Sequence, residues 1–559
     1  MERSLEALAE RSHDLLIVGG GIAGAWMAWE ASLAGLKVAL VDKGDFCGAT
    51  SANSSTILHG GLRYLQQADL TRMRKSIQER RVLLSVAPHL TRPLPCAIPT
   101  YKGLKHGRAT LGAGLLLADV IGFNRNYGLP AGRRLKAGRL LNREVLSDAV
   151  PGVECGGVTG GALWYDGQVT APGRLVLAIL QGASKEGAAL ANYVEAIAPT
   201  SVATQSGRQV TGLEVHDRRT GQQFSVEARM VVDATGPWAG HLASRVPGID
   251  ERHCPPLCGG MNLVVRRPGL DRGTFDQAAW GGRMATGDGG SRFLFAVPSG
   301  DSLFFGTRYF EHQGPPDSLT VSEQDVGCLL QWINETFPTL RLQRREVIHV
   351  HAGLLPAEPY AGSSAEPVPL RHHQIIEHQK EDGVLGLMTV VTEKLTTARS
   401  VGVEVVGRVL SLLGRAGPTG RSAERSVWGG DMEDVERFLE QAVACPMFSN
   451  VSRETARGFA THYGSEFGRV LEYLPPATLQ PDEGDLLSAG AAFALRHEMA
   501  QTLSDVALRR VYQSGGGVPA DKALEILARR MGRERCWDEE RVAAEVAAMD
   551  TATYSEKEQ

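Results

Sequence analysis

The sequence lacks a long apolar run, an excess of one charge and a leader-like start. Net charge is −4 over 559 residues, so the chain has no basic footprint of the kind that nucleic-acid-binding proteins carry. The first fourteen residues are polar and charged and contain no apolar core of signal-peptide type. The most apolar run, 109–123, is interrupted by Asp119 and is too short to span a bilayer. We expect a helix there, with burial in the protein favoured over an interfacial position.

Cysteine is also scarce, with eight residues scattered along the chain. Without a signal peptide, this scatter favours reduced thiols in the cytoplasm over disulfides. Cys254 and Cys258 form the only close pair, and neither a second pair nor a neighbouring histidine cluster completes a zinc site. We therefore predict no metal.

Near the N-terminus, the segment 14–43 has the pattern of a βαβ unit. Its expected elements are a strand at 15–18, a helix at 23–34 and a strand at 36–41. Gly19, Gly21 and Gly24 form G-x-G-x-x-G between the first strand and the helix, and Asp42 ends the second strand. These glycines permit a tight turn, close approach of a pyrophosphate and close helix–strand packing, and the acid can accept bonds from ribose hydroxyls. The pattern predicts a dinucleotide site; the alternative is a glycine-rich turn without a ligand.

Small hydroxyl-bearing residues follow directly, among them Thr50, Ser51 and Ser55. Such side chains cap helices and bind phosphate or ribose oxygens. Next comes His59-Gly60-Gly61, whose glycines allow a flat ligand to approach the backbone, and then Arg63 and Tyr64. A capped helix followed by a loop is the alternative interpretation. Further along, Gly236 follows a buried strand and would let the chain pass close to a cofactor.

Taken together, several stretches make the chain resemble the FAD-dependent glycerol-3-phosphate dehydrogenases of the D-amino-acid-oxidase-like flavoprotein superfamily. They are GGGIAG (19–24), ATSANSSTILHGGLRYL (49–65), VVDATGPWA (231–239), FFGTR (304–308), AGLLP (352–356) and EKLTTAR (393–399). The resemblance implies an α/β fold: a Rossmann-like FAD-binding domain with an antiparallel-sheet substrate domain, plus a C-terminal all-α domain. The implied boundaries are 1–414 with a cap-like sheet mainly within 255–375, a linker at 415–430, a helical domain at 431–549 and a disordered tail at 550–559.

The same resemblance assigns roles to individual residues. Arg63, Tyr64 and Lys394 are the implied catalytic residues. The FAD contacts that we expect are Gly19, Gly21, Gly24, Asp42, Thr50, Ser51, Ser55, His59, Gly60, Gly61, Val194, Gly236 and Thr396. We also expect residues 392–394 to open a helix at 395–413 whose N-terminus points at the flavin, where its dipole would favour negative charge on the reduced ring.

The chain departs from the family pattern at the substrate positions. Leu355 stands where the family has an arginine that helps to bind the substrate's phosphate. Thr392-Glu393 replaces a glycine pair, and Thr56 replaces a lysine. Arg308 stands where the family has a small or uncharged residue, and we expect it to supply the missing anion contact, together with Arg63 and Lys394.

These features lead to a functional hypothesis with two alternatives. The first is oxidation of glycerol 3-phosphate to dihydroxyacetone phosphate by hydride transfer to flavin N5, with electrons passed to quinone. The second keeps the chemistry but acts on a different polyol phosphate, hydroxy acid or amine, because of Leu355 and Glu393. The third is a flavin-binding redox module without turnover.

The expected partners are a small phosphorylated polyol and an electron acceptor, with no nucleic acid. The helix at 73–84 is rich in arginine and lysine, which indicates a solvated face or contact with anionic lipid head groups. The resemblance implies peripheral attachment to the inner face of the cytoplasmic membrane, and a homodimer.

Overall fold

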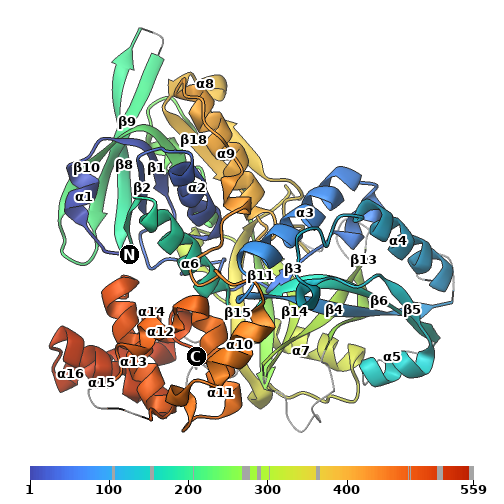
Figure 1. The fold of residues 1–559 in the computed structure, drawn as a ribbon. Coiled ribbons are helices and arrows are strands. Elements are labelled where there is room, and N and C mark those ends of the chain that lie inside the picture. Colours follow the sequence, from blue (N-terminus) through green and yellow to red (C-terminus); the bar gives the residue numbers. More distant parts are fainter. Residues whose placement is uncertain are drawn as a thin grey trace.

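The computed structural model describes residues 1–102, 107–150, 157–205, 207–266, 277–285, 291–300, 302–359, 366–475, 478, 480–512 and 520–552. The chain forms two regions, each built on a large β-sheet, and a C-terminal helical region that packs below the first of them (Figure 1). The predicted fold class, α/β with an antiparallel-sheet domain and a C-terminal all-α domain, is confirmed. In the described part of the chain, no helix combines the length and the apolarity needed to cross a bilayer.

The first sheet has a parallel centre, with strand order β16-β18-β10-β1-β2-β7. Its strands are β1 (His13–Val18), β2 (Val38–Val41), β7 (Ala189–Ala191), β10 (Gln223–Asp233), β16 (Gln374–Glu377) and β18 (Leu387–Val391). β1 and β2 are almost wholly buried, as expected for strands covered on both faces. The strands β8 (Val194–Thr204), β9 (Gly207–Asp217) and β17 (Val384–Leu385) extend this sheet beside β10. A turn at 218–222 joins β9 to β10.

Helix α2 (Ile22–Leu33) lies between α6 (Pro172–Lys185) and α9 (Ala398–Leu412), and every residue of α2 is buried. A Cβ on Gly24 would lie 1.9 Å from the carbonyl oxygen of Gly19, so the third glycine of the motif permits the predicted close packing of helix on strand. Helix α9 starts at Ala398, not at residue 395 as predicted. Residues 395–397 form a turn instead, in which the Thr396 hydroxyl accepts the His59 backbone N–H at 3.1 Å.

The second sheet has the order β15-β11-β14-β13-β12-β4-β6-β3, with β5 paired to β6. Its strands are β3 (Ile57–Leu58), β4 (Thr91–Tyr101), β5 (Arg139–Leu141), β6 (Val158–Val169), β11 (Leu257–Arg266), β12 (Ala278–Ala285), β13 (Ser291–Ser299), β14 (Ser302–Glu311) and β15 (Val347–Pro356). The sheet is antiparallel except where β12 pairs with β4. Helices α5 (Arg143–Ala149) and α7 (Glu323–Thr336) pack on it. It thus also uses strands from residues 57–169, which the sequence pattern did not assign to it.

Helices α3 (Leu70–Val86) and α4 (Arg108–Ile121) lie together on the outer side of the second sheet (Figure 1). Arg80, expected on a basic helix face, is instead buried against Asp166. The favoured burial of the apolar run 109–123 is wrong, because only Leu115 of α4 is buried. Leu116, Val120 and Phe123 are 70%, 68% and 78% exposed, which leaves the interfacial alternative.

The C-terminal region is helical, as predicted. Its helices are α10 (Val435–Val443), α11 (Arg453–Tyr463), α12 (Phe467–Leu471), α13 (Glu483–His497), α14 (Leu503–Arg509), α15 (Asp521–Arg535) and α16 (Glu539–Ala552). Helix α16 enters the predicted tail by three residues, and 553–559 lie outside the described residues. The predicted linker is bound to α2, because the Glu30 carboxylate accepts the N–H groups of residues 420–422.

Buried ion pairs join the helical region to the first sheet region. Arg510 donates two bonds to the Asp45 carboxylate, at 2.6 and 2.7 Å, and Arg509 donates a third at 2.6 Å. On the other side of the interface, Arg174 Nη2 forms an ion pair with Glu498 Oε1, and the two atoms are 2.5 Å apart. All five side chains are at most 10% exposed. The loop after β2, which contains Asp45, is therefore fixed by residues more than 450 positions away.

We predict that Arg510→Ala strongly destabilises the protein. The substitution leaves the buried Asp45 without its two-bond partner, and breaking such a pair costs about 3–5 kcal/mol. Thermal and guanidinium unfolding monitored by circular dichroism would show it as a lower midpoint. Arg529→Ala, which breaks the exposed pair with Glu525, is the control and should change the midpoint little. Equal midpoints for the two variants would contradict the role of the Asp45 pairs.

Candidate active site

One large cavity, of about 1600 Å³, lies where the first sheet, the second sheet and the helical region meet. Ligand sites for small molecules commonly measure about 300–1,000 Å³, so this cavity has room for a dinucleotide and a small substrate together. Its lining includes the glycine turn after β1, the end of β2, the 49–65 stretch and residues 392–396. Segments far apart in the sequence thus converge on the carboxyl ends of the parallel strands, where α/β sheets bind ligands.

The glycine turn forms one wall. Gly19 has φ +109°, and a Cβ there would lie 2.6 Å from the Ala234 carbonyl oxygen. Gly21 is the N-cap of α2 and has no side chain to cover the helix end. Both glycines line the cavity with the first residues of α2. A helix N-terminus with bare N–H groups and no side chain in the way suits a pyrophosphate, so this wall fits the predicted dinucleotide.

Asp42 lies beside that turn at the end of β2. Its carboxylate accepts the N–H of Gly20 at 2.6 Å and the N–H of Gly44 at 2.8 Å. Burial raises the pKa of Asp42 to about 6, although these two backbone bonds pull it down. A carboxylate has lone pairs left after two such bonds, so Asp42 can still accept from ribose hydroxyls while it is ionised.

The C-terminal region also reaches this end of the cavity, which the sequence analysis missed. Thr502, Ser504, Asp505 and Arg509 line it. The Tyr193 hydroxyl donates to Asp505 at 2.7 Å. The available signal was the Arg509-Arg510 pair at the end of an otherwise apolar helical stretch, because two adjacent arginines there need buried acidic partners.

Beside the glycine turn, hydroxyl side chains connect segments that are distant in sequence. Thr50 Oγ1 donates to the Leu354 carbonyl at 2.8 Å, and Ser51 Oγ accepts the Ile22 N–H at 3.1 Å. Both residues line the cavity, as do Ser55 and Thr396. These hydroxyls therefore hold the 49–65 stretch against α2 and β15, around the space for the ligand.

The His59-Gly60-Gly61 turn is held by a buried carboxylate. The Gly60 N–H donates to Asp166 Oδ1 at 2.6 Å, and Arg80 pairs with the same oxygen. Gly61 has φ +83°, the left-handed region that favours glycine. Desolvation in the cavity lowers the pKa of His59, although Asp166 opposes the shift. His59 is therefore neutral near pH 7.

Beyond this turn lies a cluster of charged side chains around Tyr64. Lys394 Nζ lies 2.7 Å from Glu393 Oε1, and Arg72 Nη2 lies 3.5 Å from the same oxygen. The Arg72 guanidinium and Lys394 Nζ are 4.5 and 5.2 Å from the centre of the Tyr64 ring. Arg63 also lines this part of the cavity. Burial raises the pKa of Tyr64, so its hydroxyl stays protonated.

The structure brings most of the predicted site residues to the cavity. Those that line it are Gly19, Gly21, Asp42, Thr50, Ser51, Ser55, His59, Gly61, Arg63, Tyr64, Gly236, Lys394 and Thr396. Gly24 and Gly60 lie behind the wall and shape it. Val194 also lies outside the lining; its N–H donates to the Asp42 carbonyl at 2.7 Å, so it supports the acidic residue.

Arg308 is a correction to the sequence prediction. Its neighbours Thr307 and Tyr309 line the cavity, but Arg308 does not. Its guanidinium instead pairs with Asp325 of α7 at 3.0 Å. Alternation along β14 sends this side chain to the other face of the sheet, so it does not replace the arginine missing at Leu355. Leu355 itself does line the cavity, as do Arg72 and Arg371.

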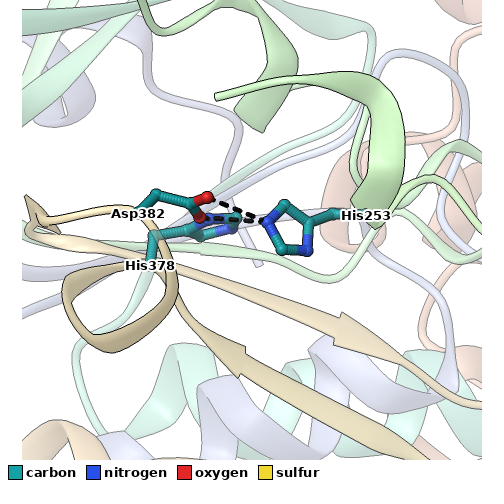
Figure 2. A group of neighbouring side chains, drawn as sticks. All are labelled: His253, His378 and Asp382. Carbon is teal, nitrogen blue, oxygen red and sulfur yellow. Dashed lines mark hydrogen bonds and ion pairs between the residues drawn. The ribbon is translucent and has the colours of Figure 1, made fainter. Parts of the chain in front are cut away.

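His253, His378 and Asp382 form a second group of titratable side chains (Figure 2). None of the three lines the cavity. His378 is the first residue of α8 (His378–Glu381), and its Nδ1 lies 2.7 Å from Asp382 Oδ2. His253 Nε2 lies 3.0 Å from the same oxygen. His378 Nε2 is 2.9 Å from the Thr389 hydroxyl, and Arg252 pairs with the other oxygen of Asp382. The carboxylate is thus already bound by two imidazoles and a guanidinium, and this cluster is complete as a hydrogen-bonded group.

Two relatives align along nearly the whole chain. A glycerol-3-phosphate dehydrogenase of Synechocystis sp. is 29% identical over 524 residues, which cover 91% of this chain and 90% of the relative. An aerobic glycerol-3-phosphate dehydrogenase of Staphylococcus epidermidis is 27% identical over 511 residues, which cover 90% and 87% of the two chains.

Among solved structures, the glycerol-3-phosphate dehydrogenase of Bacillus halodurans in complex with FAD superposes with a TM-score of 0.75. The superposition covers 99% of this chain and 98% of that one, at 24% identity. This likeness shows that the two chains share their fold over all three regions.

We predict that FAD binding depends on the ionised form of Asp42. Burial raises the pKa of Asp42 to about 6. We therefore expect FAD affinity to fall as the pH drops through about 6, because protonation converts one acceptor oxygen of the carboxylate into a donor. Asp42→Asn should weaken FAD binding by about tenfold to a hundredfold, the equivalent of about 1.5–3 kcal/mol, and flatten this pH dependence. Fluorescence titration of the apoprotein with FAD measures both effects. Glu525→Gln, at an exposed partner of Arg529 outside the cavity lining, is the control; an unchanged affinity in Asp42→Asn would contradict the assignment.

The family matches agree with this geometry. Residues 14–386 match the family described as FAD dependent oxidoreductase, and residues 421–542 match the C-terminal domain of alpha-glycerophosphate oxidase. The glycine turn, Asp42 and the size of the cavity fit FAD as the cofactor. The chain belongs to the FAD-dependent oxidoreductase family.

Proposed function

We propose that the protein oxidises glycerol 3-phosphate to dihydroxyacetone phosphate, with quinone as the electron acceptor. The observation that carries the proposal is the cationic end of the cavity, where Arg63, Arg72, Arg371 and Lys394 line one space with Tyr64. Relatives with the name glycerol-3-phosphate dehydrogenase align over about nine-tenths of the chain and support it. Bound FAD would supply the hydride acceptor.

The side chains at this end can bind the substrate's phosphate and polarise its carbinol oxygen. A phosphate group needs cationic donors, and guanidinium and ammonium groups from separate segments surround the space. Lys394 is paired with a carboxylate, so we assign it to anion binding and to polarising the developing carbonyl. Tyr64, with its raised pKa, is a hydroxyl donor. Walls from all three regions exclude water and fix the orientation of the substrate.

A different substrate of the same chemistry is the second candidate. Leu355 presents an apolar side chain to the cavity, and Glu393 places a carboxylate among the cations. Both changes alter the anion-binding end of the cavity and point to a different polyol phosphate, a hydroxy acid or an amine as the substrate. Loss of turnover, with the protein acting as a flavin-binding redox module, is the third reading.

Anaerobic reduction of the flavin separates these readings. We expect millimolar glycerol 3-phosphate to bleach the flavin absorption of the holoprotein. Leu355→Arg should lower the half-saturating concentration by about tenfold to a hundredfold, because a charge-assisted bond contributes about 1.5–3 kcal/mol. Leu355→Met is the matched control. If glycerol 3-phosphate does not bleach the flavin but a hydroxy acid or an amine does, the second candidate is supported. If no compound of a broad substrate panel bleaches the flavin, the redox module is supported.

The exposed surface of α3 and α4 supports delivery of electrons to a membrane quinone. We name this surface the α3–α4 face; it comprises Leu70, Leu116, Val120 and Phe123 with Arg74 and Lys75. Its apolar members are 48–78% exposed, and Arg74 lies 4.8 Å from the Phe123 ring. Apolar side chains flanked by cations are typical of surfaces that bind anionic lipid head groups. We assign peripheral attachment to this face. A homodimer remains a prediction.

Vesicle cosedimentation tests this assignment. The double variant Val120→Ser, Phe123→Ser should bind phosphatidylglycerol vesicles at least about tenfold more weakly, because each large apolar side chain contributes about 1.5–3 kcal/mol when buried. Val202→Ser, at an exposed position of β8 on another region, should bind like the wild type. Equal binding by all three proteins would contradict a lipid-binding role of the α3–α4 face.

A further inference from the structure

Glu393 is an unusual side chain for a cavity that is to receive a phosphate. Its carboxylate is 7% exposed and lies between Lys394 Nζ, at 2.7 Å, and Arg72 Nη2, at 3.5 Å. Glu393 Oε1 is buried, and no well-aligned hydrogen bond reaches it from the described residues. This oxygen is thus held by the charges of Lys394 and Arg72, the two cations that a substrate anion entering this part of the cavity would meet.

We propose that Glu393 is a specificity-determining residue that occupies the anion position of the cavity and must give it up before a phosphate-bearing substrate binds. This inference rests on the proposed function of the site. A carboxylate between two cations satisfies them in the empty protein. A second anion brought to the same place is repelled until Glu393 is neutral or turns away. The residue therefore sets the affinity for anions, in addition to the effect of Leu355.

The charges around Glu393 make this exchange dependent on pH. Burial raises the pKa of Glu393 to about 7. A hydrogen bond from its own backbone and the charge of Arg72 oppose this shift, and the charge of Glu358 adds to it. The groups that face Glu393 are Arg72 of α3, Tyr64 of the 62–67 turn, Lys394 of its own segment and Glu358 after β15. Tyr64 keeps its proton, since its own pKa is raised. The carboxyl of Glu393 is therefore the group of this set that changes charge near neutral pH.

The sign of the effect follows from the charge of the occupant. Below about pH 7 the carboxyl is protonated, and the two cations are available to a ligand. Above that pH the carboxylate competes for them. If only the form with protonated Glu393 binds the anion, about a tenth of the protein can bind it at one pH unit above the pKa. Anion affinity should therefore fall about tenfold between pH 6 and pH 8.

Sulfate is the suitable probe, because a phosphate monoester changes its own charge near pH 6 and sulfate does not titrate in this range. Sulfate would be titrated into the holoprotein, with the change in flavin absorption as the readout and without turnover. We expect wild-type affinity to fall about tenfold from pH 6 to pH 8. Glu393→Gln should bind sulfate about tenfold more tightly than wild type at pH 8, with a flat pH profile.

Glu358→Gln is the matched control, because it removes a nearby negative charge that does not contact Lys394 or Arg72. It should keep the slope of the wild type. If the sulfate affinity of the wild type does not change with pH, the proposal is overturned, even if Glu393→Gln loses its flavin. It is also overturned if the sulfate affinities of the wild type and of Glu393→Gln change equally with pH. Failure of glycerol 3-phosphate to reduce the flavin rejects the proposed function instead, and leaves the sulfate titration as an independent test of Glu393.

Discussion

Buried carboxylates at the end of β2 are the interaction on which the site depends. Asp42 binds the backbone of the glycine turn and of its own loop, through the N–H groups of Gly20 and Gly44. Three residues later, Asp45 is bound by Arg509 and Arg510 of the helical region. Isolated charges of this kind would be costly to bury. The loop therefore has its shape only when both the sheet and the helical region are in place, and cofactor site and domain docking form together.

Buried acidic side chains paired with cations also occur at the opposite end of the cavity. Asp166 fixes the glycines at 60 and 61 through a backbone bond and the buried Arg80. Glu393 balances Arg72 and Lys394. At the first position the acid is structural, because its partners are backbone and a buried arginine. At the second position the acid lines the cavity together with Arg72 and Lys394, where we propose that a ligand anion replaces it. Asp166 and Glu393 are both acidic, so their different roles come from their surroundings and not from the residue type.

The sequence predicted the parts of this site that are local. The βαβ unit around Gly19 and Gly24 was identifiable because glycine spacing, apolar strands and Asp42 all lie within thirty residues. Helix α4 was misjudged because an apolar composition does not say which neighbours will cover it; Leu116 and Phe123 remain uncovered. The side of the sheet that receives Arg308 depends on the irregular register between β11 and β14, which no local pattern reveals.

Long-range pairing explains the remaining difference between sequence and structure. Arg509 reaches the cavity only because α14 docks on the loop after β2, a contact between segments 464 positions apart. Arg72 and Lys394 meet over Tyr64 for a similar reason. Family resemblance carried Lys394 and Tyr64 to the site but was silent about Arg72 and Arg371, which no quoted motif contains. Departures from a family motif, such as Glu393, are therefore interpretable only with their spatial partners. This replacement of a family glycine is the counterion of Arg72 and Lys394, the two cations that a substrate anion would need.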